Sequence, residues 1–475
     1  MKYEKFESCS SRHYLTMEIA PSQTQMETWL SGCDWLDYKS FFFDTISSSS
    51  ILDVIGTKMS ITIDGDVLNM LEELFAIQNR LAATLPMDFK RSLYDAVNWD
   101  QRMIILTGAR GTGKTTMVLQ HYMERYGDVS QCLYVSADNP LVLKAGIYET
   151  ATEYFKYYGD CLIVDEVHKQ KDWSIELKAL YDAYPEKRFI ILGSSALNIK
   201  TEKGDLSRRA VSYCLPCLSF REYLQLKYRT AYKFYSFSQI LTDHEKIAAH
   251  LVKTHKNILT HFNEFLMHGG FPFFLDTTVD EYFNMLANII DKVIYEDIST
   301  IKTLKSFSSL KLKKLLAFIT LSKIPLFNIE SLKTEIEVSK DTLYEYFGLL
   351  HRADLVNVIR TKSKNIRAFK NSKILLQNPN LYYAVALELW KREADKGNIR
   401  ESFFASQIGT LYPLFSSLQT DFIVCVGKKE FEVEVGGRSK KKKQIKGLKN
   451  ACIFKDTIEI GAANIIPLYL AGFLF

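Results

Sequence analysis

Residues 102–116 read RMIILTGARGTGKTT, and the rest of the chain can be interpreted outward from this stretch. Its first part, Met103–Thr107, is an apolar run typical of a short buried strand. The part that follows, residues 108–115, fits the pattern G-x-x-x-x-G-K-[ST] at every position. Glycines let this backbone curl into a nest of N–H groups, and the helix that begins at Lys114 points the positive end of its dipole into the nest. The stretch therefore predicts an α/β fold with a parallel sheet and a phosphate-binding loop.

The loop also predicts which residues contact a nucleotide. Lys114 would reach the β- and γ-phosphates of ATP, and the hydroxyl of Thr115 would ligate Mg²⁺. The alternative is a glycine-rich turn that binds nothing, but the order of strand, loop and amphipathic helix is the one that the motif requires. The predicted nucleotide-binding residues are Gly108, Ala109, Arg110, Gly111, Thr112, Gly113, Lys114, Thr115 and Thr116.

A second acidic pattern follows at residues 161–166, which read CLIVDE. Four apolar residues predict a central parallel strand, and carboxylates at the carboxyl end of such a strand lie where open α/β sheets bind ligands. We expect Asp165 to hold Mg²⁺, directly or through water, and Glu166 to position and polarise the attacking water. Strands that end in Asp-Glu are common, and the complete phosphate loop upstream is what favours the catalytic interpretation.

Two further segments offer candidate catalytic residues. A strand predicted at 189–196 ends near Ser194 and Ser195, whose hydroxyls either sense the γ-phosphate or cap and turn the chain. Arg208 and Arg209 precede another predicted strand at 211–215. An arginine here could stabilise transition-state charge in its own subunit or in a neighbour's, which would require a homo-oligomer, or it could be a solvated surface residue.

Length and composition limit the class of protein. A chain of 475 residues is expected to form about three domains. Its net charge of +5 is mild, so any nucleic-acid surface must be a local patch. The sequence has neither an apolar run long enough to span a bilayer nor a secretory signal. Its eight cysteines are scattered, which suits a reducing compartment. We predict a cytoplasmic protein without a membrane partner.

Several motifs together resemble a known family. The segments TGARGTGKTT, LYVSADN, CLIVDEVHKQKDWSIELKALYD, ILGSSA, DLSRRAVSY and LSFREYL are similar to bacterial and archaeal ATPases in which an AAA-type P-loop core is fused to a C-terminal domain of uncharacterised function. The resemblance runs from about Leu71 to the end of the chain and implies a core of the additional-strand type. Many members carry Gly where this chain has Arg208, which leaves open whether Arg208 or Arg209 is the arginine finger. The residues at motif positions are Lys114, Thr115, Asp165, Glu166, Ser194 and Arg209.

The segments after the core predict binding modules. Residues 218–300 are helical and resemble the family's lid. Residues 301–375 have the pattern of three helices and a hairpin, as in a winged helix, which serves either to bind DNA or to dock proteins. A set of basic side chains near the hairpin could lie along DNA phosphates. These are Arg360, Lys362, Lys364, Arg367 and Lys370.

Residues 376–475 read α-β-β-β-α-β and resemble the restriction-endonuclease-like fold. In that fold an Asp, a Glu and a Lys two residues later hold Mg²⁺ and activate water. The candidate carboxylates are Glu401, Asp421, Glu432 and Glu434. Gly436 stands two residues after Glu434, so the lysine is missing from its usual place. The run Lys440–Lys443 could substitute for it, although a charge run is more often a solvated surface. We predict an inactive domain.

These observations predict an AAA-type switch that binds and hydrolyses ATP and couples the nucleotide state to C-terminal modules that bind DNA or protein. The alternatives are an ATP-gated nuclease, which Gly436 disfavours, and a non-hydrolysing nucleotide-dependent adaptor, which Glu166 disfavours. Residues 1–69 stay unassigned, either as an extension or as sequence upstream of an internal start at Met70. The predicted domains are a P-loop core at 70–217, a helical lid at 218–300, a winged helix at 301–375 and a nuclease-like domain at 376–475.

Overall fold

The computed structural model describes residues 65–193, 206, 208–298, 306–322, 329–362, 372–389, 393–437 and 445–475. The chain divides into two compact units, Met1–Arg80 and Leu81–Phe475. The described part of the first unit belongs to helix α3, Gly65–Ala83, which continues into the second. In the part of the chain that the structure describes, no helix is both long and apolar enough to cross a membrane.

A five-stranded sheet forms the core of the P-loop region, in the order β2-β3-β4-β1-β5. Every neighbouring pair is parallel, which confirms the predicted α/β class. Strand β4 lies between the strand of the phosphate loop and the strand that ends in Asp165, as the additional-strand arrangement requires. The strands are β1 (Met103–Thr107), β2 (Cys132–Ser136), β3 (Cys161–Asp165), β4 (Arg188–Leu192) and β5 (Val211–Cys214).

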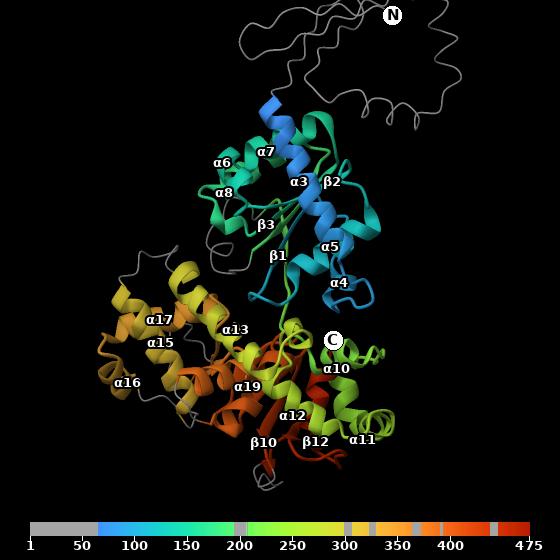
Figure 1. Cartoon of the computed structure of the whole chain (residues 1–475). Helices are drawn as coiled ribbons and strands as arrows, with labels where there is room; N and C mark the ends of the chain where they lie inside the picture. The colour runs from blue at the N-terminus through green and yellow to red at the C-terminus, as the bar shows by residue number, and fades with distance from the viewer. Residues whose placement is uncertain are drawn as a thin grey trace, which may run out of the picture. The chain divides into compact units, whose positions relative to one another are not determined.

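Helices flank this sheet (Figure 1), and all five residues of β1 and of β3 are buried. Residues 140–157 form two helices and not one, because Gly146 has φ 89° and ends the first one. Glu176 reinforces the break by accepting a hydrogen bond from the backbone N–H of Tyr148 at 2.9 Å. The helices are α5 (Lys114–Arg125), α6 (Pro140–Ala145), α7 (Ile147–Tyr157) and α8 (Trp173–Ala183).

Strand β4 ends at Leu192, earlier than the predicted limit at residue 196. Ser194 and Ser195 lie outside the described residues.

The segment after the core is helical, as its sequence predicts. Three of its helices begin with a capping box, in which a Ser or Thr side chain and a Glu or Gln three residues later satisfy each other's backbone N–H groups. The helices are α10 (Phe220–Tyr228), α11 (Phe237–Thr254), α12 (Ile258–His268) and α13 (Val279–Lys292), with a short turn η2 (Pro272–Leu275) before α13 and a π-helical turn η3 (Val293–Asp297) after it.

Three helices and an antiparallel hairpin follow, in the predicted order. The hairpin is joined to the next sheet, because the N–H of Ser416 donates to the carbonyl of Arg360 at 2.9 Å. Lys364, Arg367 and Lys370 lie outside the described residues. The elements are α15 (Ser306–Leu321), α16 (Ile329–Ile336), α17 (Lys340–Arg352), β6 (Val356–Ile359) and β7 (Lys373–Leu376).

The last part of the chain forms a second five-stranded sheet, in the order β12-β11-β10-β9-β8. Strands β8, β9 and β10 pair antiparallel, and β10, β11 and β12 pair parallel. A helix is predicted between the third and fourth strands, and residues 438–444 of that interval lie outside the described residues. The elements are α18 (Pro379–Ala384), α19 (Lys396–Ile408), β8 (Leu414–Ser416), β9 (Phe422–Val426), β10 (Lys429–Gly436), β11 (Ala451–Lys455) and β12 (Ile465–Pro467).

Buried apolar side chains show which of these parts share a core. One cluster extends from Cys217 to Leu474 and includes residues of the helical segment, the hairpin and the second sheet. A separate cluster fills the P-loop sheet. Residues after the core therefore pack as one body.

Candidate nucleotide site

The backbone of the phosphate loop requires glycine. Gly108, Gly111 and Gly113 all have positive φ, at 146°, 78° and 90°. A Cβ at Gly108 would lie 2.3 Å from the carbonyl oxygen of Leu215, so no side chain fits there. Helix α5 begins directly after Gly113 with no side-chain cap, which leaves its first N–H groups facing the loop. These groups and the helix dipole favour an anion at this position.

Lys114 lies inside the loop. Its side chain is buried, and Nζ donates to the carbonyl oxygens of Gly108 and Ala109, both at 2.9 Å. Burial lowers the pKa of Lys114, while the negative charge of Asp165 opposes this effect. The loop thus holds an ammonium at the place where the motif predicts contact with phosphate.

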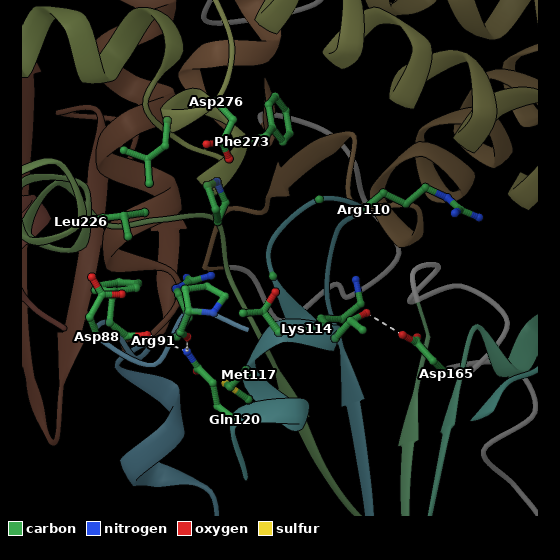
Figure 2. Close-up of a pocket in the computed structure, with 18 of the residues that line it drawn as sticks. Asp88, Arg91, Arg110, Lys114, Met117, Gln120, Asp165, Leu226, Phe273 and Asp276 are labelled. Atoms are coloured by element: carbon green, nitrogen blue, oxygen red, sulfur yellow. Dashed lines mark hydrogen bonds between the residues drawn. The ribbon is translucent and has the colours of Figure 1, made fainter. Parts of the chain in front are cut away.

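Thr115 and Asp165, the two predicted metal ligands, meet. The Thr115 hydroxyl donates to Oδ2 of Asp165 at 2.5 Å, and this hydrogen bond is the dashed line that ends on Asp165 in Figure 2. The Tyr134 hydroxyl donates to the same oxygen at 3.1 Å. Asp165 is 5% exposed, and burial raises its pKa. A hydroxyl beside a carboxylate is an oxygen donor set that fits Mg²⁺.

Glu166, the predicted water-positioning residue, follows directly and has φ 48°. Its backbone N–H donates to Oδ1 of Asp165 at 2.7 Å. Its carboxylate contacts the loop, because Oε1 accepts from Nη1 of Arg110 at 3.3 Å. Oε2 lies 3.3 Å from Nε2 of His168. The two carboxylates therefore differ in their surroundings, with Asp165 bonded to hydroxyls and Glu166 to an arginine and a histidine.

A cavity of about 530 Å³ opens beside the loop and is lined by residues of two parts of the chain. Arg110, Lys114 and Glu166 line it from the P-loop region. Other lining residues come from the end of α10 and from the turn η2, neither of which carries a nucleotide motif in the sequence. These include Leu226, Arg229, Pro272, Phe273 and Asp276.

Arg91 connects the loop to the first helix after the core. Its Nη1 donates to the carbonyl of Thr112 at 2.6 Å, and its Nη2 donates to the carbonyl of Pro216 at 2.8 Å. It also forms an ion pair with Glu222 of α10, at 3.1 Å from Nε to Oε1, and both side chains are buried. Sequence inspection missed this residue because its partners are distant in the chain.

The arginine and serine candidates remain predictions. Arg209 forms a two-pronged ion pair with Asp182 of α8, with Nε–Oδ1 and Nη2–Oδ2 distances of 2.9 Å. It is not among the residues that line the cavity, and Arg208 is exposed. Ser194 lies outside the described residues, so its role is not tested by the geometry.

A second polar cluster lies in the C-terminal part. Lys373 of β7 is buried, and its Nζ donates to Oε2 of Glu401 at 2.8 Å and to Oδ1 of Asp421 at 2.7 Å. Burial acts to lower the pKa of Lys373, but the two carboxylates outweigh it and raise the pKa. The lysine is absent from its usual place, since Gly436 stands two residues after Glu434, and a cation reaches Glu401 and Asp421 from the earlier strand β7 instead.

Asp421 also accepts from the backbone N–H of Val435 at 2.8 Å, which places it beside the strand that contains Glu434. Among the described residues, no three or more His, Cys, Asp or Glu side chains are arranged to hold a metal ion.

Two family models match parts of the chain. Residues 100–224 match the model described as an AAA domain, and residues 259–391 match a domain of unknown function (DUF8612). An uncharacterized protein of Methanocaldococcus jannaschii is 29% identical over 296 residues, which cover 58% of this chain. The matched region covers 61% of that protein, so this chain spans less than two thirds of its length.

Solved structures show weaker likeness. The AMPPCP-bound DnaA from Aquifex aeolicus is 15% identical, with a TM-score of 0.24, over 59% of this chain and 90% of its own. A katanin structure is 17% identical, with a TM-score of 0.22, over 42% of this chain and 65% of its own. Residues 100–224, which match the AAA domain model, contain the parallel sheet and its phosphate loop, the arrangement of a P-loop NTPase core.

Proposed function

We propose that the protein binds ATP with Mg²⁺ and hydrolyses it, and that the nucleotide state repositions the body formed by residues after the core. The observation that carries this proposal is the 2.5 Å contact between Thr115 and Asp165, with Glu166 next in the chain. Mg²⁺ bound there would neutralise charge on the phosphates. The same elements present the ammonium of Lys114 and the carboxylate of Glu166, so binding and water activation are combined in one place.

Each residue has a defined task in this proposal. The loop N–H groups and Lys114 bind the β- and γ-phosphates and favour the charge that develops there. Glu166 accepts a hydrogen bond from a water and aligns it for attack on the γ-phosphorus. The cavity's second wall, with Phe273 and Leu226, comes from beyond the core. Contact of that wall with a bound nucleotide would couple the nucleotide state to α10 and to the turn η2, which carry these side chains.

We propose DNA or a protein as the partner of the C-terminal part. The order of three helices and a hairpin in residues 306–376 supports a winged-helix assignment. The helix and mixed sheet after it support a nuclease-like assignment. Lys373 supplies a cation beside the carboxylates of this domain. Its ammonium, however, is bonded to both Glu401 and Asp421. We therefore keep binding without cleavage as the proposal, and ATP-gated cleavage as the alternative that a DNA assay decides.

Two substitutions test ATP binding and hydrolysis separately. Lys114→Ala should abolish ATP binding, because it removes the cation held inside the loop. Glu166→Gln should still bind ATP and leave it unhydrolysed, because the loop and the Thr115–Asp165 pair stay intact. Calorimetric titration measures binding, and phosphate release measures turnover. Lys144→Ala, on an exposed lysine of α6, is the matched control. Turnover by Glu166→Gln at the wild-type rate would show that Glu166 does not position the water.

A further inference from the structure

Arg110 of the phosphate loop is bound by a residue from beyond the core. Its Nη2 donates to Oδ1 of Asp297 at 2.8 Å, and its Nε donates to Oδ2 at 3.1 Å. The side chains of Arg110 and Asp297 are 10% and 1% exposed. Asp297 is the last residue of η3, which directly follows α13. Two charge-assisted hydrogen bonds in a buried setting make this a strong, geometrically specific contact.

The same guanidinium restrains the predicted water-positioning residue. Nη1 of Arg110 donates to Glu166 at 3.3 Å, and His168 lies between Glu166 and Asp297, with Nε2 at 3.3 Å and 3.7 Å from their carboxylates. Burial lowers the pKa of His168 to about 4, so its imidazole is neutral near pH 7. Arg110 therefore supplies the positive charge that these two carboxylates share in the cluster.

Arg110 is placed to have another anionic partner. It lies between Gly108 and Gly111, in the turn that the motif wraps around phosphate, and it lines the cavity. In Figure 2 its side chain extends away from Lys114. A phosphate offers a guanidinium the same two-pronged geometry as a carboxylate and carries more charge. A terminal phosphate bound in the loop would therefore offer this guanidinium an alternative to Asp297.

We propose that Arg110 exchanges Asp297 for the terminal phosphate of ATP, so that Asp297 is the residue through which the C-terminal body senses the nucleotide. This inference rests on the proposed ATP binding. The exchange also removes the Arg110 contact from Glu166. Because coupling between two equilibria is reciprocal, weakening the Arg110–Asp297 contact must strengthen ATP binding. ADP lacks the competing phosphate, so its affinity should change little.

Asp297→Asn tests the exchange, since it keeps the shape of the side chain and removes its charge. We expect its affinity for ATP to rise by about three- to tenfold while its affinity for ADP stays near that of the wild type. Both are measured by calorimetric titration with Mg²⁺ present. Asp291→Asn is the matched control, because Asp291 lies in α13 and pairs with Lys313 of α15, so its contact does not reach the phosphate loop. The control should leave both affinities unchanged.

Two further measurements make the test decisive. In an Arg110→Ala background, Asp297→Asn should no longer change the ratio of ATP to ADP affinity, because the competing side chain is gone. In the Glu166→Gln protein, amide hydrogen exchange at residues 293–297 should be faster with ATP than with ADP. The hydrogen-exchange measurement is made on a protein that keeps Asp297 unchanged.

An unchanged affinity ratio in a folded Asp297→Asn protein, or equal exchange in the two nucleotide states, would overturn the proposal. Failure of the wild type to bind ATP would instead overturn the proposed function.

Discussion

At the scale of single residues, the phosphate loop combines contacts among its own neighbours with contacts to residues far away in the chain. The loop contacts of Lys114 and the meeting of Thr115 with Asp165 follow from spacing, because a parallel sheet brings the carboxyl ends of its strands to one edge. Arg110 and Asp297 are 187 positions apart, and nothing in either neighbourhood marks them as partners. Only the folded structure shows that Arg110 of the loop is hydrogen-bonded to Asp297.

Arg209 gives a residue-scale prediction about subunit geometry. It is paired with Asp182 and does not line the cavity of its own chain, so a role as an arginine finger would be exerted on a neighbouring subunit. Arg209→Ala should then lower ATP turnover by about a thousandfold or more with little change in affinity. Turnover is measured for the variant alone and mixed with Lys114→Ala, and recovered activity in the mixture identifies action across a subunit boundary.

The control for this prediction is Asp182→Asn. This variant keeps the arginine at position 209 and removes only the negative charge of its ion-pair partner. Wild-type turnover by Arg209→Ala would assign the finger to Arg208 or to no arginine of this segment.

At the scale of elements, most strands and helices follow from periodicity and capping signals, and the exceptions have local causes. Gly146 separates α6 from α7 because its backbone adopts a positive φ. The position of Lys373 could not be predicted, because it depends on how the hairpin packs against α19 and the second sheet. Lys373 ties these three elements together through Glu401 and Asp421.

Removing the charge of Lys373 should loosen this junction. Lys373→Met leaves two poorly exposed carboxylates without the ammonium between them, so we expect the free energy of unfolding to fall by about 3–5 kcal/mol. Urea denaturation measures the change. Lys362→Met is the control, because Lys362 forms an exposed ion pair with Glu430 and should change stability little. Equal losses in the two variants would contradict a special role for Lys373.

The same variant addresses the nuclease alternative. Wild-type protein incubated with plasmid DNA, ATP and Mg²⁺ or Mn²⁺ should not nick the DNA, because the Lys373 ammonium is already bonded to both carboxylates. Nicking that disappears in Lys373→Met and Asp421→Ala proteins that are still folded would establish a hydrolytic centre there.

At the scale of the whole molecule, the sequence predicts several successive modules after the core, whereas the buried apolar cluster from Cys217 to Leu474 is continuous. Periodicity within a segment identifies its helices and strands but carries no information about which segments share a core. The P-loop sheet has its own cluster, so its boundary with the following body is the main division between hydrophobic cores in the described residues after Arg80.

We expect the C-terminal body to bind duplex DNA weakly and without sequence preference through the basic run that begins at Arg438. Such binding should fall steeply between about 50 mM and about 200 mM salt, because it depends on the release of counterions from phosphates. Fluorescence polarisation with two unrelated duplexes measures it, and ATP turnover with and without DNA shows whether the site responds. Lys441→Glu with Lys442→Glu should remove the binding. Affinity that is insensitive to salt or specific for one duplex would contradict this expectation.

The two arginines that link the phosphate loop to the C-terminal body differ in a way that determines how the body can move. Arg91 is buried, bonds the loop carbonyl of Thr112 and pairs with Glu222, and it has no phosphate role in the proposed exchange. Arg110 holds Asp297 by a contact that a phosphate can replace. Loss of the Arg110–Asp297 contact would therefore let the segment at residues 293–297 move, while Arg91 keeps α10 attached to the loop.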